Sequence, residues 1–271
     1  MPRIIANGIA INYDQQGSGE PLVLIPYLAA DHACYTFQVA EYAKHFACFS
    51  LDLRGTGESD KSEGAYTTES LADDVAAFMQ AAGIPKAHIA GLSLGAAVGM
   101  WVAVKYPDKV ETLSLHGAWP KTDAFIRTVV ESWQVMARAV GVPEMTVRGI
   151  FPWCFTPELY ASRPDYLESL AGFVRSRPQQ SVEDFMLQSN AVIDHDVAAG
   201  LGRIAAPTLM TFGRHDLVTS TRFAQPLASA IPSSEVLIFE TCAHAALYEN
   251  VEEFNRRTLV FLQRHGGAAA V

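Results

Sequence analysis

Several features that would assign this chain to a common class of protein are absent from its sequence. No hydrophobic run approaches the roughly 20 residues of a membrane span, and the first residues lack the apolar core of a signal peptide. Basic residues are scattered, and the formal net charge of −9 argues against binding to nucleic acid. We therefore expect a cytoplasmic protein that partners with neither a membrane nor nucleic acid.

Cysteine is also scarce and widely spaced. Cys34, Cys48, Cys154 and Cys242 form no Cys-x-x-Cys pair, which fits reduced thiols in the cytosol. No cluster of cysteine and histidine has the spacing of zinc ligands, so we expect no metal site. Internal repeats, low-complexity stretches and linkers are missing as well, which favours one domain over two independent ones.

What the sequence does contain is a large supply of apolar residues, 49% of the 271. Short apolar runs alternate with helical patterns, which is typical of an α/β protein with a parallel sheet. Asn7-Gly8 is a hairpin signal, and we place the two strands beside it antiparallel at one edge. The expected strands are Ile4–Ala6, Ile9–Tyr13, Pro21–Ile25, Ala47–Leu51, Ala87–Ala90, Val110–His116, Pro207–Phe212 and Glu235–Phe239. The expected helices between them are Ala33–His45, Thr68–Ala82, one after Ser93, Thr221–Ala230 and Val251–Arg264.

The alternation stops at Trp119 and resumes at Pro207. Between these residues the pattern is helical throughout. The expected helices are Asp123–Val140, Pro143–Ile150, Pro157–Ser162, Asp165–Ser176 and Val182–Leu201. We interpret residues 119–206 as an all-helical cap on a core formed by residues 1–118 and 207–271.

The chain is organised around Gly91-Leu92-Ser93-Leu94-Gly95, between an expected strand and a helix that begins with small residues. A serine hydroxyl is a weak nucleophile and must be raised clear of a sheet to meet a base and a substrate. Gly91 and Gly95 leave room where a Cβ would collide with a neighbouring element. We therefore predict Ser93 as a nucleophile on a sharp, strained turn.

A serine nucleophile needs a base, and the base needs an acid that orients it. His244 follows the last expected strand, and Asp216 follows the strand before it. The order Ser, Asp, His is the one expected for this architecture. The neighbouring His215 is interpreted as a loop residue, His32 and His88 as surface or loop residues, and His195 as part of a solvent-facing charged cluster.

A hydrolysed carbonyl also requires an oxyanion hole. One donor is expected to be the backbone N–H of Leu94, next to the nucleophile, and the other the N–H of Leu28, after the strand Pro21–Ile25. Further candidates for contact with the substrate are Tyr27, Trp119, Trp153 and Val218.

With these residues in place, the chain resembles the α/β-hydrolase superfamily along nearly its whole length. Besides the motif around Ser93, the resemblance rests on Asp52–Ser59, Phe212–Asp216 and Cys242–His244. It implies an eight-stranded, mostly parallel sheet flanked by helices, an all-helical cap inserted after the sixth strand, and no cofactor. The segment Val23–Asp31, with Tyr35 and Gln38, looks more like the group of 3-oxoadipate enol-lactonases, small bacterial esterases and acyl-homoserine-lactone hydrolases.

The sequence therefore predicts a serine hydrolase that cleaves a carboxylic ester or lactone of a small, largely apolar acyl substrate through an acyl-enzyme. One alternative is a hydrolase of C–C bonds in aromatic ring-cleavage products, which needs polar groups for a dienol and a carboxylate. Another is a ligand-binding protein of the same fold without catalysis. The oligomeric state stays open.

Overall fold

A twisted sheet of eight strands runs through the molecule. The computed structural model describes residues 2–61 and 63–266, and its strands follow the order β1-β2-β4-β3-β5-β6-β7-β8. Strands β3 to β8 pair in parallel, whereas β1 and β2 are antiparallel to their neighbours at one edge. The eight-stranded, mostly parallel sheet and its antiparallel edge are confirmed. The strands are β1 (Arg3–Ala6), β2 (Ile9–Gln16), β3 (Glu20–Ile25), β4 (Phe46–Leu51), β5 (Ala87–Leu92), β6 (Val110–His116), β7 (Thr208–Gly213) and β8 (Ser234–Phe239).

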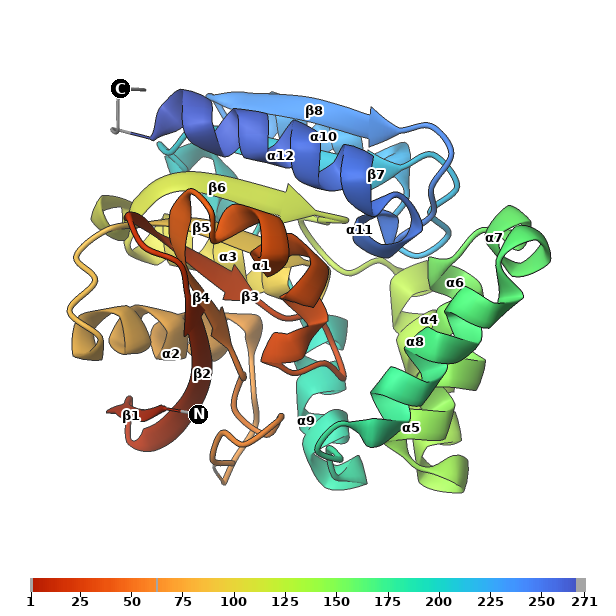
Figure 1. Ribbon diagram of the computed structural model, residues 1–271. Helices are drawn as coiled ribbons and strands as arrows, with labels where there is room; N and C mark the ends of the chain where they lie inside the picture. Colours follow the sequence, from red (N-terminus) through yellow and green to blue (C-terminus); the bar gives the residue numbers. More distant parts are fainter. Residues whose placement is uncertain (1, 62, 267–271) are drawn as a thin grey trace.

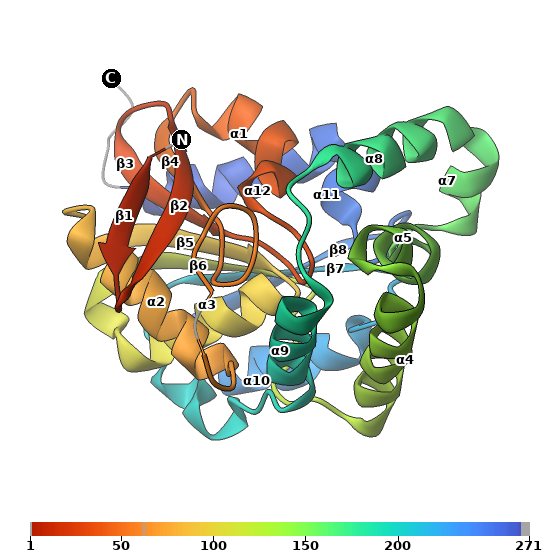
Figure 2. The same cartoon turned by 90° about the horizontal axis from the view of Figure 1, so that it is seen from below.

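Helices cover both faces of this sheet (Figures 1 and 2). Alternate side chains of a strand point to opposite faces, so Leu22 and Leu24 join one hydrophobic core and Val23 and Ile25 the other. Both sets are buried, which explains why β3 is a continuous apolar run. The first core lies under α1 (Thr36–Tyr42) and α12 (Val251–His265); the second lies under α2 (Thr68–Ala81), α3 (Leu94–Lys105) and α10 (Ala224–Ala230).

The segment between β6 and β7 is helical, as predicted. In both views α4 to α8 stand together to one side of the sheet, and Figure 1 places them beyond the carboxyl ends of its strands. Its helices are α4 (Ala124–Val140), α5 (Val142–Met145), the π-helical turn η3 (Thr146–Ile150), α6 (Phe151–Cys154), α7 (Pro157–Ser162), α8 (Pro164–Ser176), α9 (Val182–Ile193) and the 3-10 helix η4 (Ala198–Arg203). The division into a core and a cap at residues 119 and 206 stays a prediction, and η4 packs against α3.

Two expected helices were wrong in their extent. The helix expected over Val182–Leu201 ends at Ile193, because the next residues bond to the chain before α4: Thr122 N–H donates to the His195 carbonyl and Val197 N–H to that of Pro120, both at 2.9 Å. The helix expected over Ala33–His45 is the 3-10 helix η1 (His32–Tyr35) followed by α1, and it ends at Tyr42.

Two other expected helices have the predicted extent but change type along their length. The one over Pro143–Ile150 is α5 followed by the π-helical turn η3, and the one over Thr221–Ala230 is the 3-10 turn η5 (Thr221–Phe223) followed by α10.

The sequence also missed short helical turns. The four-residue helix α11 (Ala246–Glu249) is too short to show a helical period. The 3-10 turn η2 (Pro107–Lys109) was not predicted either. Across the residues that the structure describes, we find no helix with both the length and the apolar character needed to cross a membrane.

The close approach of α3 to β3 generates a prediction about stability. A Cβ on Gly95 would lie 2.1 Å from the carbonyl oxygen of Ile25, so something must move. We expect Gly95→Ala to lower the free energy of unfolding by about 3 kcal/mol, measured by urea denaturation. A Cβ on Gly172, in the exposed part of α8, meets nothing within 4 Å. Gly172→Ala should therefore be neutral or slightly stabilising, and equal stabilities of the two variants would contradict the prediction.

Candidate active site

Ser93 lies on the turn between β5 and α3. Its backbone angles are φ 54° and ψ −118°, a conformation that residues with a Cβ rarely adopt. The turn is held because Ser93 N–H donates to the carbonyl of His116 on β6 at 2.8 Å. A Cβ on Gly91 would lie 2.2 Å from the carbonyl oxygen of Gly95, so the turn can close only with glycine there. The strained strand–turn–helix is the one that the sequence predicts.

Asp216 and His244 come from the loops that follow β7 and β8. The two loops touch backbone to backbone, since a Cβ on Gly213 would lie 1.9 Å from the carbonyl oxygen of Ala243. This approach brings His244 Nδ1 to 2.8 Å from Asp216 Oδ2. Both residues are buried. The structure therefore brings the predicted acid and base into one hydrogen-bonded pair.

The surroundings of Asp216 keep its carboxyl group ionised. Burial alone would raise its pKa, but the charge and hydrogen bond of His244, together with bonds from Thr219 and Val218, lower it below its usual value. Oδ1 accepts the backbone N–H groups of Val218 at 2.7 Å and Thr219 at 3.0 Å, and Oδ2 accepts the Thr219 hydroxyl at 2.8 Å. A carboxylate can only accept, so the bond to Asp216 places a proton on His244 Nδ1 and leaves Nε2 as the nitrogen that can face a substrate.

Ser93 and His244 line a single cavity, which we call the central cavity. Tyr27 and Leu28 reach it from the loop after β3, and Tyr248 reaches it from α11. The helices between β6 and β7 supply a mostly apolar wall that includes Trp133, Ile150, Phe151, Phe155, Leu170 and Phe173. The cavity thus brings Ser93, the predicted nucleophile, and His244, the predicted base, together with space for an apolar group.

Tyr35 joins the loop of Leu28 to the turn of Ser93. Its buried hydroxyl donates to the carbonyl of Ile25 at 2.8 Å and accepts the N–H of Leu92 at 3.0 Å. These two groups lie at the ends of β3 and β5, just before the two segments whose amides are predicted to bind an oxyanion. The role of Tyr35 as a bridge could not be predicted from the sequence, because a hydroxyl group shared by two strands leaves no local pattern.

Four residues were predicted to contact the substrate, and three of them, Trp119, Trp153 and Val218, do not line the central cavity. Trp119 is 1% exposed and its indole N–H donates to Thr122 at 2.8 Å. Trp153 packs edge-on against Phe125, with ring centroids 6.2 Å apart. Val218 is buried, and its backbone N–H serves Asp216. We therefore withdraw these residues as substrate contacts and retain Tyr27.

The structure adds a charged pair to the cavity wall that the sequence did not indicate. Arg177, which follows α8, donates through Nε to Asp31 Oδ2 at 2.8 Å, and both residues line the central cavity. They are 146 residues apart in the sequence. The bond therefore joins the helical segment to the loop after β3.

The loop that carries His244 is also bound to the helical segment. Ala245 N–H donates to the carbonyl of Cys154 at 3.0 Å. The carboxylate of Glu249 accepts the N–H of Thr156 at 2.6 Å and its hydroxyl at 2.8 Å, and it also accepts the N–H of Ala243. Residues on both sides of His244 are thus hydrogen-bonded to the end of α6 or, through Glu249, to the chain that follows it.

Three histidines expected at the surface are buried. His195 is 2% exposed and contacts Thr68 Oγ1 at 2.9 Å and the carbonyl of Trp119 at 3.2 Å, so the predicted solvent-facing cluster was wrong. Burial lowers the pKa of His195 to about 4 and keeps it neutral. His88 and His32 are buried as well. Composition around a histidine does not show whether a neighbouring element covers it.

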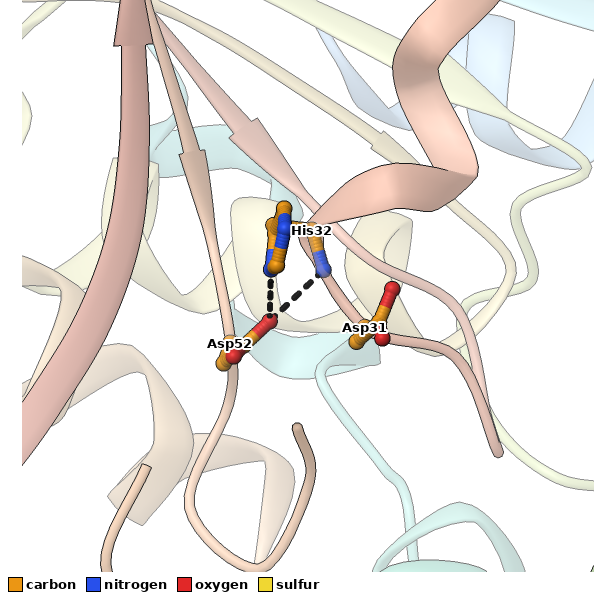
Figure 3. Close-up of side chains that lie close together, drawn as sticks. All are labelled: Asp31, His32 and Asp52. Carbon is orange, nitrogen blue, oxygen red and sulfur yellow. Dashed lines mark hydrogen bonds and ion pairs between the residues drawn. The ribbon is translucent and has the colours of Figure 1, made fainter. Parts of the chain in front are cut away.

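Asp31, His32 and Asp52 form a buried cluster whose geometry could suit a cation (Figure 3). Two bonds of 2.7 Å converge on Asp52 Oδ1, one from the His32 backbone N–H and one from its Nδ1. Asp52 Oδ2 accepts from Asn12 at 2.7 Å and from Glu58 N–H at 2.9 Å. Because Asp31 is also paired with Arg177, we interpret the cluster as a hydrogen-bonded support for the loop after β3.

The His32–Asp52 pair predicts a dependence of stability on pH. Burial tends to lower the pKa of His32, but the hydrogen bond and charge of Asp52 raise it above its usual 6.5. The stabilisation is therefore complete below pH 6.5 and is lost as the pH rises through the raised pKa. We expect urea unfolding to show a larger deficit for His32→Asn at pH 6 than at pH 9, with the exposed His45→Asn as the control. A deficit that grows with pH would contradict this account.

Similarity to known proteins identifies the family of this chain. Residues 17–251 match the family described as alpha/beta hydrolase fold. The chain is 26% identical to 3-oxoadipate enol-lactonase 2 of Acinetobacter baylyi, over 96% of each protein. It is also 26% identical to the putative carbamate hydrolase RutD of Azorhizobium caulinodans, over 96% of this chain and 98% of that one. The crystal structure of the enol-lactonase from Burkholderia xenovorans LB400 superimposes with a TM-score of 0.87 at 25% identity, covering 97% of this chain and all of that one. The chain belongs to the α/β-hydrolase family.

Proposed function

We propose that this protein is a serine hydrolase that cleaves a carboxylic ester or lactone through an acyl-enzyme. The observation that carries the proposal is the 2.8 Å bond from His244 to Asp216, because His244 lines the same cavity as Ser93. Similarity to a 3-oxoadipate enol-lactonase over nearly the whole chain supports a lactone or a related ester as the substrate.

In this mechanism His244 removes the proton of Ser93 as its oxygen attacks the carbonyl carbon of the substrate. Asp216 holds the imidazole in the required tautomer and stabilises its charged form. His244 then gives the proton to the leaving alkoxide and afterwards activates the water that hydrolyses the acyl-enzyme. No cofactor takes part in these steps.

We assign the oxyanion hole to the backbone N–H groups of Leu94 and Leu28. Leu94 begins α3, so its amide lies at the positive end of the helix. Leu28 lines the central cavity three residues after β3, whose last carbonyl abuts Gly95 of α3. This close approach supports placing the two amides on one side of the reacting carbonyl.

We also propose that residues 119–206 act as the cap of the cavity and select an apolar acyl group. Its aromatic and aliphatic side chains form most of the apolar wall of the cavity that Ser93 also lines. Hydrolysis of C–C bonds would need an uncompensated positive charge for the substrate carboxylate. Since Asp31 already pairs with Arg177 at 2.8 Å, the cavity favours the ester or lactone. An intact pair of His244 and Asp216 beside Ser93 favours catalysis over ligand binding alone.

Ser93→Ala should abolish turnover and leave the fold intact, because it removes only the nucleophilic oxygen. We expect kcat for short p-nitrophenyl esters and for lactones to fall by roughly 10⁴-fold or more, with an unchanged melting temperature. Ser169→Ala, on an exposed position of α8, is the matched control. Esterase activity near that of the wild type in Ser93→Ala would refute the assignment.

Asp216→Asn should lower kcat by about 10⁴-fold, because an asparagine amide favours the wrong tautomer of His244. The measurement is steady-state hydrolysis of the same esters and lactones, with KM determined separately. A loss confined to KM would mean that Asp216 supports substrate binding rather than the base.

A further inference from the structure

Thr219 supplies two of the four hydrogen bonds that the described residues make to the carboxylate of Asp216. Oδ1 accepts the backbone N–H groups of Val218 at 2.7 Å and Thr219 at 3.0 Å. Oδ2 accepts the Thr219 hydroxyl at 2.8 Å and lies 2.8 Å from His244 Nδ1. A carboxylate offers about four lone-pair sites, so these bonds use its full capacity as an acceptor.

The hydroxyl of Thr219 and the imidazole of His244 share one oxygen atom. Both lie 2.8 Å from Asp216 Oδ2, and they are 3.3 Å from each other. Thr219 is buried, and its single hydroxyl proton points to the carboxylate. Towards His244 Nδ1 the Thr219 oxygen can therefore only accept, at a longer distance than that of the bond to Asp216.

The end of β6 holds the hydroxyl and the ring in this arrangement. A Cβ on Gly117 would lie 2.8 Å from Cε1 and 3.1 Å from Nδ1 of His244, and 3.3 Å from the hydroxyl oxygen of Thr219. The carbonyl of the preceding residue, His116, accepts the N–H of Ser93 at 2.8 Å. The segments that follow β6, β7 and β8 thus meet at the point where Thr219 contacts His244.

Charged and titratable groups on the elements around this pair are bound elsewhere, uncharged or exposed. They are His116 on β6, Cys154 on α6, Arg222 on η5, Glu249 on α11 and the exposed His215 beside Asp216. Arg222 pairs with Asp123 at 3.0 Å, and Glu249 accepts from Thr156 at 2.6 and 2.8 Å. Burial raises the pKa of Cys154 well above its usual 9 and lowers that of His116 to about 3, so neither is charged at pH 7.

We propose that Thr219 is a positioning residue for His244: its hydroxyl shares Asp216 Oδ2 with the imidazole and thereby limits how strongly this oxygen stabilises the protonated ring. The inference rests on the proposed function, in which His244 must be neutral to take the proton of Ser93. Each donor withdraws electron density from the oxygen that it bonds, so the second bond to that oxygen is weaker. The ring therefore becomes available as a base at a lower pH than it would beside a carboxylate with an unused lone pair.

The first measurement is the pH dependence of kcat/KM for a p-nitrophenyl ester, which reports the protonation of groups in the free enzyme. Thr219→Val removes the hydroxyl and keeps the shape of the side chain. We expect its acid limb to lie roughly half a unit to one unit higher in pH, so that kcat/KM on this limb falls about three- to tenfold. Thr219→Ser keeps the hydroxyl and should retain the position of the wild type.

The second measurement does not depend on turnover. A proton held between His244 Nδ1 and a carboxylate should give a downfield signal in the one-dimensional ¹H NMR spectrum, identified by its loss in His244→Asn. Because Thr219→Val leaves Oδ2 to the imidazole, the remaining bond should shorten and the signal should move further downfield. Thr219→Ser should leave the signal in place.

Two further variants complete the experiment. Thr208→Val, at the opposite end of β7, removes an equally buried hydroxyl, which donates to the carbonyl of Ala206 at 2.9 Å. It should change neither the acid limb nor the signal. Thr219→Ala removes the same hydroxyl as Thr219→Val and takes its place if that variant does not fold.

An acid limb or an NMR signal that stays in place in Thr219→Val would overturn the inference. So would an equal loss of kcat/KM at every pH, which a hydroxyl that only supports the fold would produce. A wild type without a downfield signal that His244→Asn removes would contradict the bond to Asp216 on which the inference depends. A protein that shows the NMR change but hydrolyses no ester or lactone overturns the proposed function and leaves the shared oxygen standing.

Discussion

Two direct contacts between backbone segments fix the positions of the loops and the turn that carry the candidate site. The carbonyl of Ile25 lies where a Cβ of Gly95 would be, and the carbonyl of Ala243 lies where a Cβ of Gly213 would be. The first contact brings the loop after β3 against the start of α3. The second brings the loops after β7 and β8 together. Ser93, the pair of Asp216 and His244, and the predicted oxyanion donors are therefore positioned by strand ends in a sheet rather than by flexible side chains.

Among the residues that the structure describes, two pairs of imidazole and carboxylate have both partners buried, and their surroundings differ. His244, which pairs with Asp216, lines the same cavity as Ser93, and this supports the proposal that its second ring nitrogen acts on a substrate. His32 and Asp52 are bound within a network that includes Asn12 and the backbone of Glu58. The pairing alone is thus no evidence of catalysis; access to a nucleophile and to space for a substrate distinguishes the two.

The helical segment over the cavity is connected to the core from two directions. Arg177 pairs with Asp31 after β3, and Thr156 is bound through Glu249 to the loop of His244. These hydrogen bonds hold the apolar wall of the cavity against the core.

Local patterns in the sequence determined the strands, the strained turn at Ser93 and the loops of Asp216 and His244. Buried parallel strands are apolar runs, and a sharp turn needs glycine, so both are visible in a single segment. Tertiary structure alone decided which side chains reach the cavity. Trp119 is held away from it by a bond to Thr122, and Trp153 packs against Phe125. His195 is covered by Thr68 from another element. The roles of Tyr35 and Arg177 depend on contacts across 10 and 146 residues of chain, which no local pattern records.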